Sequence, residues 1–168
     1  MITNKIKSVQ LKKAIDKLKK KRQFATNTSN RVLLVISEDN FEVYGSLQNL
    51  SKSLGLPANA FDVVICGSVR DLDDKDLWQV SFKDLGLDGE IKNKDLLALL
   101  EYEFGSAIVI SGEETLLSNY VALRSGATFL IGKSPDPFSI LDVEIFENDP
   151  SLLEAELIRY YKILKNKK

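Results

Sequence analysis

The sequence predicts an α/β fold in three layers, with helices covering both faces of a mostly parallel sheet of five to six strands. Short runs rich in Val, Leu and Ile, typical of buried parallel strands, alternate along the chain with segments of helical periodicity. This alternation favours parallel strands joined by helical crossovers. The first 22 residues add a strongly basic helix, and the length of 168 residues suits a single domain.

The N-terminal segment carries two apolar stripes. Residues 8–22 have helical periodicity, with one apolar face formed by Leu11, Ala14, Ile15 and Leu18. Ile2, Ile6 and Val9 are also spaced as in a helix, but on one continuous helix they lie roughly opposite the first stripe, at about 100° per residue. Either the segment kinks or the helix has two apolar surfaces. We expect residues 1–23 to form this basic helix and residues 24–168 to form one α/β domain, entered through the polar stretch 24–30.

The first half of the domain contains three predicted strands. Residues 31–37 form a short apolar run, and the helix that follows ends near Gly55 and Pro57. Its apolar face consists of Phe41, Tyr44, Leu47 and Leu50. Residues 61–66 are a second buried strand, residues 79–82 a short third strand, and residues 83–93 a loop punctuated by glycine.

The second half repeats this alternation. A leucine-rich helix at 95–102 precedes an apolar strand at 106–111. A helix at 113–125 ends before Gly126, which suits the left-handed conformation at a helix C-terminus, and a strand follows at 128–131. Residues 141–146 alternate between apolar and acidic side chains, as in an edge strand, and Pro150 begins the last helix. The whole pattern predicts a Rossmann-like sheet.

The charge of the chain is distributed unevenly, although the net charge is only −1. Residues 1–22 carry a net +8 and residues 159–168 a net +5, whereas residues 23–158 carry a net −14. The basic helix is either a contact surface for nucleic acid, the ribosome or anionic lipid, or a solvated face that docks against the acidic domain. The side chains expected to contact a partner are Lys12, Lys13, Lys19, Lys20, Lys21 and Arg22.

The composition excludes several kinds of chemistry. Histidine is absent and Cys66 is the one cysteine, which excludes a Ser-His-Asp or Cys-His arrangement, an intrachain disulfide and a structural zinc site. No apolar run approaches the roughly 20 residues of a membrane-spanning helix, and the N-terminus lacks the apolar core of a secretory signal. We therefore expect a cytoplasmic protein with no metal, no cofactor and no catalytic residue.

A small ligand would bind at the carboxyl ends of the predicted strands, as in other open α/β sheets. The candidate residues in these loops are Ser37, Ser111, Gly112, Lys133 and Ser134. Phosphate is disfavoured, because acidic pairs stand at two helix starts and no G-x-G-x-x-G motif follows a strand. These pairs are Glu38 with Asp39 and Glu113 with Glu114.

Three further motifs resemble functional sites but have simpler interpretations. Gly132-Lys133-Ser134 resembles the end of a phosphate-binding P-loop, but Ala127 stands where that loop needs glycine and prolines follow it, so we interpret it as a turn. The acidic stretch 71–76 lacks the ligand and glycine positions of an EF-hand and is interpreted as a solvated loop. Cys66, at the end of a buried strand, is interpreted as an inert buried thiol.

Two resemblances accompany these motifs. Residues 104–133 (FGSAIVISGEETLLSNYVALRSGATFLIGK) resemble a strand–helix–strand unit of the lipopolysaccharide heptosyltransferases, which implies the local fold and carries over no catalytic residue. Most of the chain resembles a bacterial family of small proteins, a domain of unknown function, with a lysine-rich leading helix and a glycine-containing loop. The residues of that loop are Lys83, Asp84, Gly86, Gly89, Ile91, Lys92 and Asn93. This resemblance implies no established activity.

Three functional hypotheses follow from the sequence. The first is a non-catalytic binding or assembly module whose basic amphipathic N-terminal helix contacts a protein complex, RNA or the ribosome, without a motif for sequence-specific DNA binding. The alternative is a protein or enzyme that binds a nucleotide or sugar nucleotide in the crevice at the strand ends. Peripheral membrane binding through the same helix ranks third, because its first apolar stripe is short and lacks tryptophan.

Overall fold

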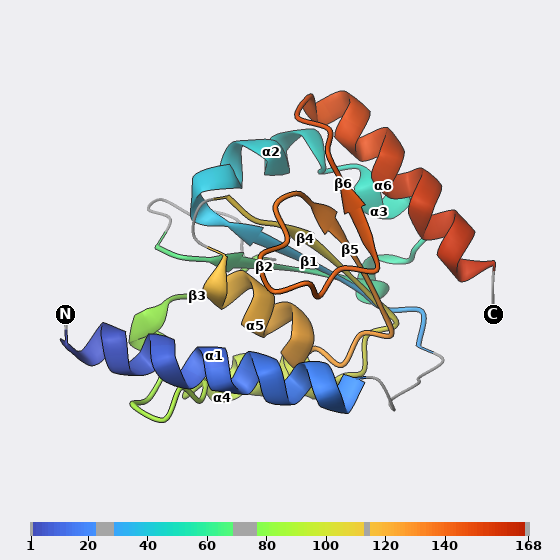
Figure 1. Cartoon of the computed structure of the whole chain (residues 1–168). Coiled ribbons are helices and arrows are strands. Elements are labelled where there is room, and N and C mark those ends of the chain that lie inside the picture. Colours follow the sequence, from blue (N-terminus) through green and yellow to red (C-terminus); the bar gives the residue numbers. More distant parts are fainter. Residues whose placement is uncertain (1, 23–28, 69–76, 113–114, 167–168) are drawn as a thin grey trace.

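The computed structural model describes residues 2–22, 29–68, 77–112 and 115–166, which form a six-stranded sheet between two layers of helices (Figure 1). All neighbouring strands pair in parallel, in the order β3-β2-β1-β4-β5-β6. The strands are β1 (Val32–Ser37), β2 (Phe61–Cys66), β3 (Leu77–Val80), β4 (Ser106–Ile110), β5 (Phe129–Lys133) and β6 (Val143–Ile145). The predicted three-layer, Rossmann-like α/β fold is therefore confirmed, and the sheet is parallel throughout.

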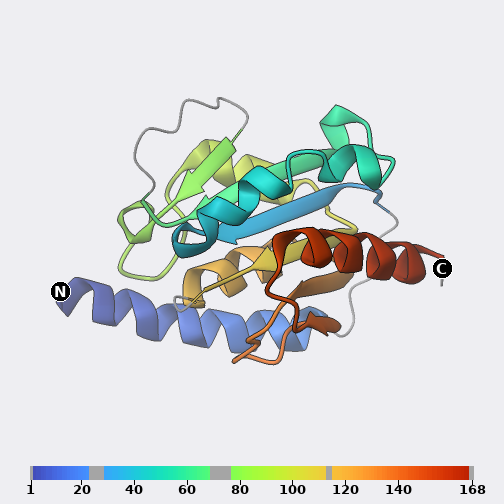
Figure 2. The same cartoon turned by 90° about the horizontal axis from the view of Figure 1, so that it is seen from above.

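α-Helices cover both faces of the sheet (Figures 1 and 2). One layer consists of α1 (Ile2–Arg22), α4 (Lys94–Glu101) and α5 (Leu116–Arg124), and the other of α2 (Phe41–Ser46), α3 (Leu50–Ser53) and α6 (Pro150–Lys165). In β1, Leu33 and Val35 pack with the first layer, whereas Leu34 and Ile36 pack with the second. A strand buried on both faces must be apolar at consecutive positions, which explains the apolar runs in the sequence.

The observed elements differ from the predicted ones mainly in their ends. α1 begins at Ile2 rather than Ser8 and is continuous to Arg22, so its two apolar stripes face opposite sides of one helix. The helix predicted after β1 is two short helices, α2 and α3, separated by a turn at 47–49. Gly45 weakens the helix there, and the turn places Leu47 in the core. β3 begins at Leu77, two positions before its predicted start.

The C-terminal part follows the prediction closely. β6 is an edge strand beside β5, as the alternating pattern of residues 141–146 predicted. The Asp149 carboxylate caps α6 by accepting the Ser151 N–H at 2.9 Å, with Pro150 in the first turn.

Some predicted features lie outside the described residues. These are the acidic stretch 71–76, Glu113, Glu114 and most of the polar stretch 24–30. Within the described ranges, no helix has both the length and the hydropathy needed to span a membrane.

Candidate functional site

The carboxyl edge of the sheet contains a topological switch point, because the chain leaves β1 to one side towards β2 and continues on the other side from β4. Open parallel sheets bind ligands at such points. Ser37 ends β1 there, and its buried hydroxyl accepts the Gly112 N–H at 2.9 Å and donates to Asp39 Oδ1 at 2.5 Å. The neighbouring Ser111 is also buried, and its hydroxyl has no hydrogen-bond partner among the described residues. Three of the five predicted crevice residues therefore lie together.

Two carboxylates of the chain lie where an anion would bind at this edge of the sheet. One of them accepts a backbone N–H group, and the other fills the space beside Gly112. Glu38 Oε2 accepts the Ser68 N–H at 2.7 Å. The Asp39 carboxylate lies in the space that a side chain at Gly112 would take. Backbone N–H groups in such loops bind phosphate in nucleotide-binding folds. Here the chain fills the site with its own negative charge, which supports the expectation that phosphate is disfavoured.

Lys133 and Ser134, the other two predicted crevice residues, belong to the pairing of β5 with β6. Lys133 pairs with Ile145, whose carbonyl accepts the Ser134 N–H at 2.8 Å. Gly132 and Lys133 lie inside β5, so the interpretation of Gly132-Lys133-Ser134 as a turn is wrong for these two residues. A Cβ at Gly132 would lie 2.5 Å from the Val109 carbonyl oxygen on β4. Close packing within the sheet therefore explains the glycine of this motif.

A cavity of about 510 Å³ opens at the same edge, on the face of the sheet covered by α1 and α5. Its lining comes from the ends of β1 and β2, the segment after β3, and the first turns of α1 and α5. No sequence pattern predicts that Asn4 or Phe82 lines this cavity. Ser118 could have been singled out in the sequence, because it is a polar residue in an otherwise largely apolar helix. The structure shows that residues 116–123 of this helix are all buried.

Cys66 is one of the residues that line the cavity, and it is buried. Burial raises the pKa of its thiol to about 12, and the neighbouring Ser118 hydroxyl opposes that rise only in part. The thiol is therefore protonated at neutral pH and a poor nucleophile, which supports its interpretation as inert. Among the described residues, no cluster of three or more Cys, Asp or Glu side chains is placed to hold a metal ion.

The raised pKa of the Cys66 thiol predicts a loss of stability at alkaline pH. Below pH 9 the thiol is neutral in both states, and its contribution to stability is fully present. Between pH 9 and about 12 the unfolded chain ionises first, so the free energy of unfolding falls by about 1.4 kcal/mol per pH unit from this group. We expect Cys66→Ala to remove that slope in urea unfolding between pH 9 and 10. Equal slopes for both proteins would contradict the assignment.

α1 lies along α5 (Figures 1 and 2). Its first apolar stripe is buried against the domain. Leu11 and Ile15 are fully buried, and Ala14 and Leu18 pack against the same core cluster. That cluster contains sheet residues such as Val35, so α1 is part of the layer that covers the sheet. α1 therefore docks against the domain through its first apolar stripe.

The glycine-containing loop at 83–93 forms part of the surface on which α1 lies. Leu85 and Ile91 pair across the loop as an antiparallel bridge and are buried. Gly89 has a φ of +80°, and a Cβ there would lie 2.9 Å from the Cβ of Gln10 on α1. Glycine combines this left-handed conformation with so close an approach of the helix. The loop therefore has a structural role in holding α1.

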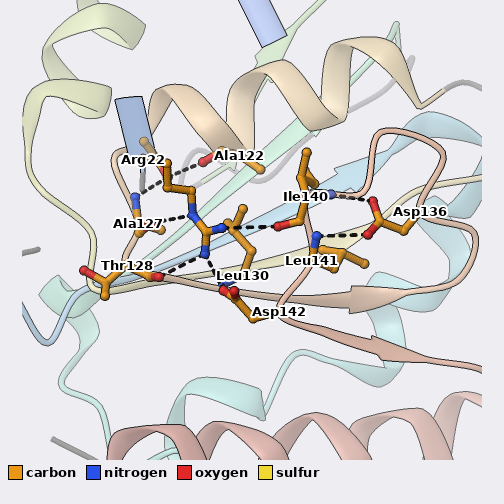
Figure 3. Close-up of polar contacts among 10 residues, drawn as sticks. Arg22, Ala122, Ala127, Thr128, Leu130, Asp136, Ile140, Leu141 and Asp142 are labelled. Carbon is orange, nitrogen blue, oxygen red and sulfur yellow. Dashed lines mark hydrogen bonds and ion pairs between the residues drawn. The ribbon is translucent and has the colours of Figure 1, made fainter. Parts of the chain in front are cut away.

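Arg22 holds the C-terminal end of α1 (Figure 3). Its guanidinium donates to the Thr128 carbonyl at 2.9 Å and forms an ion pair with Asp142. Longer hydrogen bonds of 3.4 Å reach the carbonyls of Ala127 and Ile140. Arginine suits this position because its planar fork can donate to several acceptors at once. The helix end is thus tied to the segments on both sides of β5.

Two lysines of α1 also hold the helix on the domain. Lys19 Nζ donates to the Phe138 carbonyl at 2.6 Å, and Lys7 Nζ donates to the Phe82 carbonyl at 2.8 Å. Lys19 and Arg22, two of the six side chains predicted to contact a partner, therefore make contacts within the chain.

The remaining lysines of α1 are exposed to solvent. The exposed lysines are Lys5, Lys12, Lys13, Lys17, Lys20 and Lys21. None of them forms an ion pair with another residue in the part of the chain that the structure describes. The second apolar stripe is exposed on the same helix, with exposed fractions of 77% for Ile2, 42% for Ile6 and 50% for Val9. We call this exposed surface of lysines and aliphatic side chains the outer face of α1.

Comparison with known proteins identifies the family. A family model described as a family of unknown function (DUF6913) matches residues 4–164, from the first turn of α1 to the last turn of α6. Searches of curated proteins and of solved structures found no match. Because the family model spans nearly the whole chain, this protein belongs to the family of unknown function DUF6913.

Proposed function

We propose that this protein is a non-catalytic binding module, and that the outer face of α1 docks into an apolar groove with an acidic rim on a partner protein. The observation that carries the proposal is the exposure of three aliphatic side chains on a helix whose opposite side is buried in the core. Ile2, Ile6 and Val9 occupy positions i, i+4 and i+7, the anchor spacing of helices that bind in grooves. Leu11 and Ile15 bury the opposite side and present this face outward.

The lysines on the outer face support an acidic partner. They extend from Lys5 to Lys21, over about 24 Å at 1.5 Å per residue. Lys13 and Lys20 continue the line of the apolar anchors along the helix at helical spacing. Their positive charge is not offset by ion pairs with the described residues, so it contributes to steering a negatively charged surface into place.

A protein partner fits this face better than RNA does. Proteins that bind single-stranded RNA combine positive charge with aromatic side chains or arginines that stack on bases. α1 contains no aromatic residue, and its one arginine, Arg22, donates to the domain instead. Aliphatic anchors beside lysines suit an apolar groove in a protein.

The absence of histidine and the protonated state of Cys66 support a non-catalytic role. Histidine is the commonest general base, and a thiolate is the nucleophilic form of cysteine. The chain therefore has no histidine to act as a general base, and its one cysteine is a protonated thiol rather than a nucleophilic thiolate.

The proposal is tested by site-specific photo-crosslinking of the full chain in cells. A photoreactive residue at Val9 is expected to capture one acidic protein, whereas the same residue at Lys162, exposed on α6, is expected not to capture it. The captured protein is then purified, and its affinity is measured by calorimetry at low and high salt. We expect binding to weaken with salt, because exposed charges are screened beyond about 10 Å at 0.1 M.

Two matched variants separate the outer face from the rest of the surface. The variant Lys13→Glu/Lys17→Glu/Lys20→Glu is expected to bind the captured protein at least about tenfold more weakly. The control Lys52→Glu/Lys94→Glu/Lys162→Glu changes the same number of exposed lysines elsewhere and is expected to bind nearly normally. Equal loss in both variants, or capture at Val9 of RNA or lipid in place of protein, would refute the proposal.

A further inference from the structure

The cavity at the carboxyl edge has the size and position of a small-molecule site. Its volume of about 510 Å³ lies within the range of about 300–1,000 Å³ found for ligand pockets. It opens where open parallel sheets bind their ligands, beside the ends of β1 and β2. Asn4 of α1 contributes to its lining, so the helix layer closes one side.

The hydroxyl of Ser118 is a group in the cavity that can form a hydrogen bond with a polar ligand. The residue is only 1% exposed, lies in the first turn of α5 and lines the cavity. Its hydroxyl has no oxygen or nitrogen partner among the described residues, and the thiol of Cys66 lies beside it. A buried hydroxyl without a partner is unfavourable, and sulfur is a weak hydrogen-bonding group. A ligand hydroxyl in the cavity would supply the missing partner.

Two charged side chains line the cavity, Glu38 and Lys83, and both are exposed. A hydrogen bond holds the Glu38 carboxylate at the cavity, where its negative charge disfavours a phosphate. The buried polar residues of the lining, Ser37, Cys66 and Ser118, carry no charge, since the Cys66 thiol is protonated. At one side, the Glu38 carboxylate already takes the Ser68 N–H, the kind of donor that a phosphate would use. Phe82 adds an aromatic ring and Leu117 an apolar surface to the wall. Hydroxyl groups and one ring together suit an uncharged, hydroxylated ring compound.

We propose that this cavity binds a small, uncharged, hydroxyl-bearing ring compound, a nucleoside or a free sugar rather than its phosphate, with a ligand hydroxyl bonded to Ser118. The Glu38 carboxylate accepts further ligand hydroxyls and repels a phosphate group. This site is separate from the outer face of α1, and the two proposals stand or fall independently.

The test is a titration of the ¹⁵N-labelled full chain with adenosine, uridine and ribose, each beside its 5′-phosphate. We expect at least one uncharged compound to saturate the signals of residues around the cavity, and to bind at least about fivefold more tightly than its phosphate. Binding of the nucleosides alone would identify the nucleoside class, and binding of ribose as well would identify the sugar. Failure of all three to bind, or tighter binding of the phosphates, would overturn the proposal.

Ser118→Ala is the decisive variant, and Ser111→Ala is its matched control. Both remove a buried hydroxyl that lacks an oxygen or nitrogen partner among the described residues, but only Ser118 lines the cavity. We expect Ser118→Ala to weaken binding about five- to tenfold, as for loss of one hydrogen bond, and Ser111→Ala to change it less than about twofold. Equal effects of the two substitutions would contradict the proposed contact. The lysine variants of α1 are expected to leave this binding unchanged.

Discussion

Replacing Gly105 by alanine is expected to lower the free energy of unfolding by about 3 kcal/mol or more. A Cβ at Gly105 would overlap the carbonyl oxygen of Ser29, which is backbone and cannot rotate away. Gly105 is itself held, because its N–H donates to the Arg31 carbonyl at 2.9 Å and its carbonyl accepts the N–H groups of Thr128 and Phe129 at 3.1 Å. The substitution therefore strains the point where the segments entering β1, β4 and β5 meet.

Gly45→Ala is the matched control for this prediction. Gly45 lies in α2, and a Cβ there meets no atom within 4 Å. We expect this substitution to stabilise the protein by about 0.5–1 kcal/mol, because alanine has the higher helix propensity. Urea unfolding followed by the fluorescence of Trp78, the one tryptophan, measures both variants. Gly105→Ala with the stability of the unmodified protein would show that the backbone at Ser29 can move aside.

Replacing Ile15 by alanine is expected to destabilise the protein by about 2–5 kcal/mol. Ile15 is fully buried on the side of α1 that faces α5, within the core cluster that also includes Leu11 and Val35. Truncation removes buried methyl groups and leaves a cavity, because the helix is held at Gly89 on one side and by Arg22 at its end. The surrounding structure therefore relaxes only in part.

Ile6→Ala provides a control within the same helix. Ile6 is 42% exposed on the opposite side of α1, so the same chemical change is expected to alter the free energy of unfolding by less than about 0.5 kcal/mol. Circular dichroism and Trp78 fluorescence in urea measure both variants. Equal effects at the two positions would mean that α1 is not docked through its Leu11–Ile15 side. Ile6→Ala also removes an anchor of the proposed docking face without unfolding the helix.

The strands were predictable because of a simple physical requirement. The central strands β1 and β4 are buried on both faces, so residues such as Leu33 and Leu34 must both be apolar although they point in opposite directions. A run of this kind is visible in the sequence without any tertiary information. The broken helix after β1 was less predictable, because Leu47 keeps helical spacing while it lies in a turn.

The candidate sites were predictable only in part. Ser37 and Gly112 could be placed together, because both follow parallel strands whose carboxyl ends meet at one edge. The cavity beside them also needs Asn4, Phe82 and Ser118, which come from three segments far apart in the sequence. Their meeting depends on how α1 and α5 pack on the sheet, and no local pattern encodes it.

The parallel α/β sheet and the leading helix, with its net charge of +8 and its two apolar stripes, follow from the amino-acid sequence without tertiary information. Which of the two stripes is buried follows from packing alone, since both satisfy the same helical periodicity. The choice depends on the surface that receives the helix, formed by α5 and by the loop that carries Gly89. The same docking decided that Lys19 and Arg22 bind the domain while Lys12, Lys13, Lys20 and Lys21 remain exposed. The sequence alone gives the positive charge of each lysine and arginine in α1. Whether that charge is exposed to a partner depends on how the helix packs on the domain.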